Sequence, residues 1–324
     1  MVYQVIIIEY KMSKKQYRIA NWKSYNRSLI NRGNLTLRFC DETRKNWYAK
    51  PTPHHRALGR PNVYSQQCIE VALALRSLFR LPLRATQGFL EGMFELLEIE
   101  LKVPCYSQLS RRASGLDVRF YSKKSKQRPT DLVVDSTGLK IYGEGEWKMR
   151  THGKQKRRTW RKLHLAVNPD GMTVIALELT EANVHDDSVM PDLLRNQKIA
   201  GKVYADGAYI SKSCFDSIAA TGGKASIAVR TGTGLVNKNP SPGQTLRNNL
   251  IREIRAAGGK TQWKKTSGYH KRSAAETQMF RFKTILGGGL SSRLFTNQVS
   301  EAKIKALILN KMTALGMPES YPVA

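Results

Sequence analysis

Between residues 128 and 230 the chain alternates short apolar runs with segments of helical character. The runs 162–167 and 172–180 flank the turn sequence Asn-Pro-Asp-Gly and predict a β-hairpin. Further strands are predicted at 131–135, 201–209 and 225–229, with helices at 189–197 and 211–221. Strand, hairpin, helix, strand, helix and strand in this order predict an α/β fold, a mixed sheet with helices on its faces.

The region before this sheet is predicted to be helical. Residues 69–101 give two amphipathic helices separated by Pro82, and 107–114 gives a third, on which Arg111 and Arg112 are exposed. Short helices ending in a basic one are typical of a helix-turn-helix array whose last helix enters a major groove. A plain helical bundle that carries arginines is the alternative. We therefore expect a helical DNA-binding region at 12–120 and a catalytic domain at 128–315, with translation starting at Met1 or Met12.

The charge of the chain indicates its partner. Lys and Arg number 54 against 25 Asp and Glu, a formal net charge of +29. This excess is spread along the whole length, which favours nucleic acid over a membrane surface. The four cysteines form no CxxC pair, which argues against a zinc finger or a disulfide framework and favours the cytoplasm.

Two acidic residues follow short apolar runs, Asp135 in the first predicted strand and Asp206 in the fourth. Carboxylates at the ends of neighbouring buried strands would meet in one crevice and would need a cation between them. Ligation by oxygen alone suits Mg²⁺ or Mn²⁺, and a third acid, Glu276, would allow two ions and in-line phosphoryl transfer. For a single strand-end aspartate the alternative is turn capping. His185, Asp186 and Asp187 resemble a metal cluster but precede a helix, where aspartates cap free N–H groups.

The segment 269–283 predicts an amphipathic helix with an unusual polar stripe. At 100° per residue, Tyr269, Arg272, Glu276 and Lys283 fall within an arc of about 60°, beside the apolar stripe. Phe280 interrupts this polar arc. A solvated charged face is the alternative interpretation.

These residues carry a family resemblance. The spacing Y-(2)-R-(3)-E-(6)-K at Tyr269, Arg272, Glu276 and Lys283 resembles the signature of bacterial and archaeal insertion-sequence transposases of the DDE class. The blocks 133–147 and 203–211 are similar to those around the two aspartates of that family. The segments 21–39, 78–90 and 157–167 are similar to its other blocks.

The resemblance implies an RNase H-like catalytic domain that cleaves DNA at terminal inverted repeats and transfers strands into target DNA. Asp135, Asp206 and Glu276 would be the catalytic metal ligands, and Tyr269, Arg272 and Lys283 would contact phosphates. A homodimer holding two DNA ends, on the nucleoid of a prokaryotic cell, is also implied. The gaps of 71 and 70 residues between the three acids leave little room for the large β insertion of some relatives.

A cluster of cations lies between the first two strands. It includes Arg157, Arg158 and Arg161, which we expect to contact DNA. Trp147 and Trp160 are interleaved with them and would either stack on bases or pack in the sheet. Two other functions stay open: a nuclease that does not join DNA, and a DNA-binding protein with an inactive site.

Overall fold

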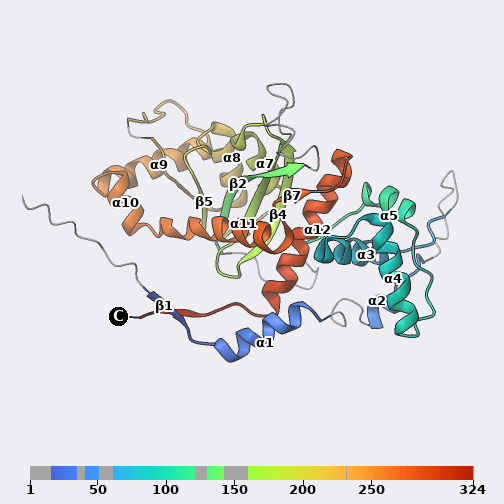
Figure 1. Ribbon diagram of the computed structural model, residues 1–324. Coiled ribbons are helices and arrows are strands. Elements are labelled where there is room, and N and C mark those ends of the chain that lie inside the picture. The colour runs from blue at the N-terminus through green and yellow to red at the C-terminus, as the bar shows by residue number, and fades with distance from the viewer. Residues whose placement is uncertain are drawn as a thin grey trace, which may run out of the picture.

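The computed structural model describes residues 16–34, 41–50, 61–120, 130–141, 160–230 and 232–323. Its centre is a mixed sheet with the strand order β4-β3-β2-β5-β6, and β7 pairs with the far end of β2 (Figure 1). These strands are β2 (Leu132–Ile141), β3 (Trp160–Asn168), β4 (Thr173–Glu181), β5 (Lys202–Ala205), β6 (Lys224–Ile227) and β7 (Gly289–Leu290).

Strand directions divide the sheet into two halves. β2, β3 and β4 form an antiparallel meander, whereas β5, β6 and β7 run parallel to β2 or to each other. Three antiparallel strands followed by parallel ones, with crossover helices between them, make the RNase H-like mixed sheet. The expected α/β fold class is confirmed.

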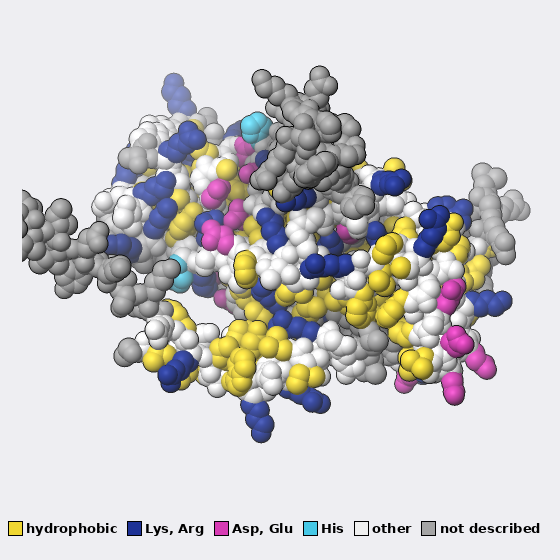
Figure 2. Space-filling model, viewed as in Figure 1, with side chains coloured by type: hydrophobic (Ala, Val, Ile, Leu, Met, Phe, Trp, Pro, Cys, Tyr) yellow, Lys and Arg dark blue, Asp and Glu magenta, His cyan; other side chains and the backbone are white. Residues whose placement is uncertain are grey.

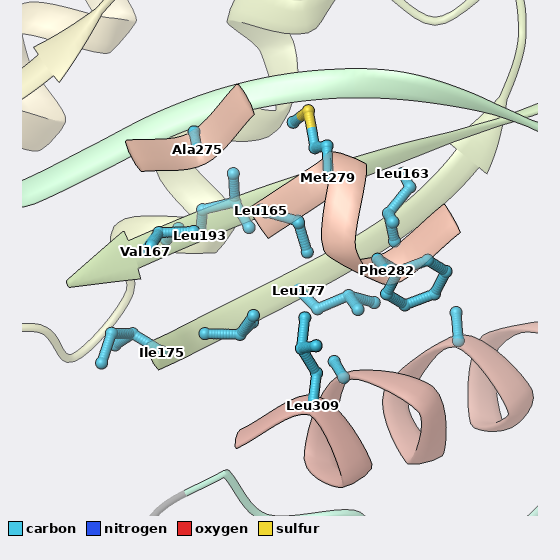
Figure 3. Packing of buried hydrophobic residues seen from close by; sticks show 14 of the residues in the cluster. Leu163, Leu165, Val167, Ile175, Leu177, Leu193, Ala275, Met279, Phe282 and Leu309 are labelled. Carbon is cyan, nitrogen blue, oxygen red and sulfur yellow. The ribbon is translucent and has the colours of Figure 1, made fainter. Parts of the chain in front are cut away.

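Helices cover both faces of this sheet. After the meander come α7 (Asp186–Leu194), α8 (Lys212–Thr221), α9 (Pro242–Ala256), α10 (Lys260–Thr266), the 3₁₀ helix η2 (Tyr269–Arg272), α11 (Ser273–Leu286) and α12 (Phe295–Ala314). Figure 3 shows α11 and α12 packed on one face of β3 and β4, with Met279 and Phe282 against Leu163 and Leu165. Phe282 and both leucines are fully buried. Alternating side chains of β3 therefore supply the core beneath α11.

Two helices fill the space in the sequence before α11. The chain between β6 and η2 forms α9 and α10; a basic helix around 245–256 is predicted by the sequence, whereas α10 is not. α9 begins at Pro242 because Ser241 caps it: the Ser241 hydroxyl accepts from the backbone N–H of Gln244, and the Gln244 side chain accepts from that of Ser241.

The N-terminal region contains α1 (Trp22–Arg32), α2 (Asp41–Lys45), α3 (Gln66–Phe79), α4 (Leu83–Leu96) and α5 (Tyr106–Ala113). Three residues separate α3 from α4, the length of a helix-turn-helix turn, whereas 97–105 separate α4 from α5. α3 and α5 pack on α12, and their buried residues join the core of the sheet. The boundary between the two predicted domains is thus crossed by shared packing.

The two ends of the described chain meet in a small sheet. β1 (Gln16–Ile19) pairs antiparallel with β8 (Ser320–Val323), with Gln16 opposite Val323. The pairing is reinforced by Asn21, whose side chain accepts from the backbone N–H of Glu319 at 2.9 Å and donates to the carbonyl of Met317 at 3.0 Å. Neither strand was predicted from the sequence.

The longest described helix, α12, has 20 residues and carries Glu301, Lys303, Lys305 and Lys311. Among the residues with described structure, no helix is long and apolar enough to cross a bilayer.

A fully buried histidine predicts acid sensitivity of the fold. His164 has no exposed surface, and burial lowers its pKa to about 4, although Asp186 lies 3.8 Å away. The pKa of His164 in the folded protein is below its value in the unfolded chain. The contribution of neutral, buried His164 to the free energy of unfolding is therefore fully present above about pH 6.5 and is lost as the pH falls toward 4. The loss amounts to about 3 kcal/mol. Urea unfolding of the wild type and His164→Gln at pH 7 and near 4.5 checks this. The wild type should lose more stability than the variant, and equal losses would contradict the prediction.

Candidate active site

Pairing of β2 with β5 brings the first two acids together. Leu132 pairs with Val203 and Val133 with Tyr204, an offset of 71 residues. Asp135 and Asp206 differ by the same 71, so the continued register brings Asp206 to the level of Asp135, beside a pair of strands whose spacing is about 4.8 Å. Asp206 directly follows β5, as predicted. Asp135 does not end its strand: β2 continues to Ile141, and the edge beside Asp135 is open because β5 has ended.

The third acid, Glu276, lies in the first turn of α11, which packs on β2 and β3. Arg272, at the preceding helix boundary, donates through Nη1 to Asp135 Oδ2 at 3.0 Å, and its Nη2 pairs with Glu276 Oε1. One guanidinium thus bridges the two carboxylates. The side chains of Asp135 and Arg272 are half-buried or more, at 15% and 25% exposure, whereas Glu276 is 54% exposed.

The electrostatics reflect this proximity. Burial raises the pKa of Asp135, and the charges of Asp206 and Glu276 raise it further, against a hydrogen bond from the backbone N–H of Ser136 and the attraction of Arg272. The pKa of Arg272 is raised because Glu276 and Asp135 outweigh the effect of its own burial. Figure 2 shows acidic side chains gathered over the region where Figure 1 places β5 and the start of α11, with Lys and Arg side chains around them.

Asp131 is a positioning residue that the sequence analysis missed. It is buried at the start of β2, and its Oδ1 accepts from the backbone N–H of Lys202 at 2.8 Å, which fixes β5 beside β2. Its Oδ2 accepts from Lys271 Nζ at 2.7 Å, which fixes the residue next to Arg272. Burial raises the pKa of Asp131, but these donors outweigh it and hold the pKa below its usual value. The sequence does contain a signal for this residue, because Asp131 opens the same apolar run that contains Asp135.

The prediction that Tyr269 lies in an exposed polar stripe of one α-helix is wrong. The segment is not one α-helix: Tyr269 lies in η2, is buried, and donates its hydroxyl hydrogen bond to the carbonyl of Ala205 at 3.0 Å. It therefore holds the residue before Asp206, and a phosphate contact would require this bond to break. Lys283 does follow Glu276 along α11, and its Nζ donates to Thr137 Oγ1 on β2 at 2.6 Å.

The predicted arginine contacts divide into three groups. Arg157 and Arg158 lie outside the described residues, as does Trp147. Arg161 is engaged internally, with Glu181 at 3.2 Å and Gln298 at 3.0 Å. Arg112 donates to the carbonyl of Tyr64 at 2.9 Å, whereas Arg111 is exposed.

Trp160 lies near two residues of β2. Its ring lies against Gly138, where an added Cβ would stand 3.1 Å from a ring carbon, and 6.0 Å from Lys140 Nζ. Trp160 is thus packed on β2, in agreement with the sheet-packing alternative.

The second acidic motif occupies a helix start, as expected. α7 begins at Asp186 with His185 at its N-cap, although no side chain caps the helix. Asp186 pairs instead with Lys162 at 3.0 Å, so the motif belongs to the packing of α7 on the sheet.

Arg272 occupies the space between Asp135 and Glu276. Within the described residues, no group of three His, Cys, Asp or Glu side chains is placed to hold a metal ion. The donor set still fits a hard cation, because Asp135, Asp206 and Glu276 offer carboxylate oxygens alone. Two of them already share a positive group.

Two family profiles, both described as "Transposase DDE domain", match the chain at residues 30–144 and 126–311. The second spans more than half of the 324 residues and includes all three acids. Among solved structures, the chain is similar to the piggyBac transposase synaptic complex with hairpin DNA, at 9% identity and a TM-score of 0.35. The similarity covers 88% of this chain and 75% of that chain.

Proposed function

Because the chain belongs to the family of transposases with a DDE domain, we propose that Asp135, Asp206 and Glu276 carry its chemistry on DNA. Members of this family cleave DNA and transfer strands, and they generally use divalent metal ions. One observation supports the residue assignment: Asp206 directly follows β5 in the register that brings it to the level of Asp135 on β2, and Arg272 connects Asp135 to Glu276.

The three carboxylates are proposed as ligands for Mg²⁺ or Mn²⁺, two ions in all. When bound, these ions activate the attacking oxygen and stabilise the leaving oxygen of an in-line displacement. The protein's part is to hold the oxygens rigidly. β2 fixes Asp135, the Tyr269 hydroxyl holds the residue before Asp206, and the Ala208 N–H donates to Asp206 Oδ1 at 2.8 Å.

Arg272 is proposed to have two successive partners. As placed, it neutralises Asp135 and Glu276, which would otherwise repel each other. With bound cations neutralising the carboxylates, its planar guanidinium would be free to pair with a phosphate of the DNA strand, a geometry that suits bidentate contact. Lys283 lies farther along the same helix, on the side of Thr137, and is proposed to contact the next part of the backbone.

The proposed partners are the terminal inverted repeats of a mobile element and its target DNA, bound by a homodimer. The net charge of +29 supports a polyanionic partner. Arg111, exposed on α5, is proposed as a contact of the N-terminal region, and Arg157 and Arg158 as further contacts.

An assay with labelled DNA ends tests the function. With Mg²⁺ or Mn²⁺ we expect both cleaved ends and products joined to a second DNA. With Ca²⁺ we expect binding and little turnover, because its larger and more flexible shell fits the transition state poorly. Cleavage without joining would make the protein a nuclease, binding alone would make it a DNA-binding protein, and full activity in EDTA would refute the metal.

A further inference from the structure

A cavity of about 560 Å³ lies where the N-terminal helices meet the sheet. One wall comes from the end of α3 and the turn into α4, with Arg76, Arg80 and Leu83. The opposite wall comes from the ends of β2 and α11 and from β7, with Lys140 and Leu286. The cavity therefore belongs to both regions of the chain.

The charges around this cavity favour an anion. Five cationic side chains and one carboxylate line it: Arg76, Arg80, Lys140, Arg293, Lys305 and Glu301. Glu301 is buried and saturated, since it pairs with Lys305 at 3.1 Å and accepts from the backbone N–H groups of Ser291 and Ser292. Neither Arg80 nor Arg293 has an ion-pair partner within the described part of the chain. Both are thus available to a ligand.

Apart from Ser77 and Ser291, the other side chains that line the cavity are apolar. Leu81, Leu83, Ile141, Leu286 and Leu290 contribute to it. A bound phosphate alone would leave the apolar lining exposed to water. A nucleotide would cover both surfaces, with its base against the leucines and its phosphate at the arginines. The volume of about 560 Å³ lies within the usual range of small-ligand pockets.

Two elements lead from the three acids to this cavity. Along β2, Lys140 is five residues beyond Asp135, about 17 Å at 3.3 Å per residue. Along α11, Leu286 is ten residues beyond Glu276, about 15 Å at 1.5 Å per residue. The bond from Lys283 to Thr137 joins β2 and α11 between these points. At the roughly 3.4 Å rise of duplex DNA, this path corresponds to four or five nucleotides, and to fewer in an unstacked strand.

We propose that this cavity is a nucleotide subsite, which receives an unpaired nucleotide of the DNA strand a few positions from the phosphate that is cut. Arg80 and Arg293 hold the phosphate, and the leucines receive the base. This proposal rests on the proposed function in one respect only, the position of the phosphate that is cut. Occupancy of the subsite is a binding event that requires no metal and no cleavage.

Fluorescence anisotropy in EDTA tests the subsite with two probes, a short blunt duplex and the same duplex with a few unpaired thymidines at one 3′ end. We expect the wild type to bind the frayed probe about tenfold more tightly, the factor that corresponds to ~1.4 kcal/mol. Arg80→Ala and Arg293→Ala should lose most of this preference and keep most of their affinity for the blunt duplex. Lys198→Ala, which removes an exposed charge elsewhere, is the matched control and should keep the preference.

A third probe separates the base from the phosphate. When the unpaired nucleotides are abasic, the preference should disappear. Equal binding of frayed and blunt probes by the wild type would overturn the subsite, and so would equal loss of both in the arginine variants. Retained preference for the abasic probe would replace it with a simple phosphate site. Because the assay contains no metal, these results are independent of whether the three carboxylates catalyse cleavage.

Discussion

Glu276→Gln should cleave DNA at least about 100-fold more slowly than the wild type at saturating protein. The substitution keeps the size of the side chain and its capacity to accept a bond from Arg272, but it removes the charge that would hold a cation. Binding to DNA should survive and improve slightly, because an exposed negative charge near the phosphates is lost. The expected defect is therefore in turnover alone.

Gel shift and single-turnover cleavage at saturating protein measure the two effects separately. Glu253→Gln is the matched control, since Glu253 is exposed on α9 and is the nearest acid upstream of Glu276. We expect this control to cut like the wild type. Normal cleavage by Glu276→Gln would remove Glu276 from the set of metal ligands, and Glu253 would then be the acid to consider.

Arg272→Ala should weaken binding to DNA by about 1–3 kcal/mol, because it removes a guanidinium suited to a bidentate phosphate contact. Its cleavage defect should be partly rescued by a higher protein concentration, which cannot rescue Glu276→Gln. Arg272→Lys is the informative partner, since it keeps the charge and loses the fork. We expect it to fall between the wild type and the alanine variant in gel shifts.

Arg272→Ala also tests whether Arg272 serves as the shared counterion of Asp135 and Glu276. Without Arg272, Asp135 and Glu276 lose their shared counterion, and Asp135 stays largely buried. Thermal unfolding in EDTA should therefore show a less stable protein, and added Mg²⁺ should stabilise the variant more than the wild type. An equal response of both proteins to Mg²⁺ would show that Arg272 does not serve as the counterion of this site.

Local pattern was sufficient for the sheet and for the position of Asp206. The apolar alternation at 162–167 and 172–180 and its turn predicted the meander, and the order of strands and helices predicted the fold class. It also placed an acid in the fourth apolar run, and β5 ends at Ala205, directly before Asp206, although the strand was predicted to extend to residue 209. These features depend on neighbours in sequence, so a single sequence contains them.

Tertiary contacts decided what the sequence did not predict. Asp135 was expected to end its strand, but pairing with β3 extends β2 to Ile141. Tyr269 was expected on a polar surface, but its hydroxyl found the carbonyl of Ala205, 64 residues away. The role of Asp131 depends in the same way on Lys202 and Lys271, which the fold alone brings together.

The pairing of β1 with β8 has a consequence for biosynthesis. About three hundred residues separate the partners, so β1 leaves the ribosome long before β8 is made. Through that interval its edge is unpaired, and α1 follows it with Trp22 and Ile30 largely exposed. The nascent chain thus exposes an aggregation-prone segment until the whole central sheet has been translated. Changes at residues 16–32 should therefore affect the folding of the nascent chain as well as the stability of the finished protein.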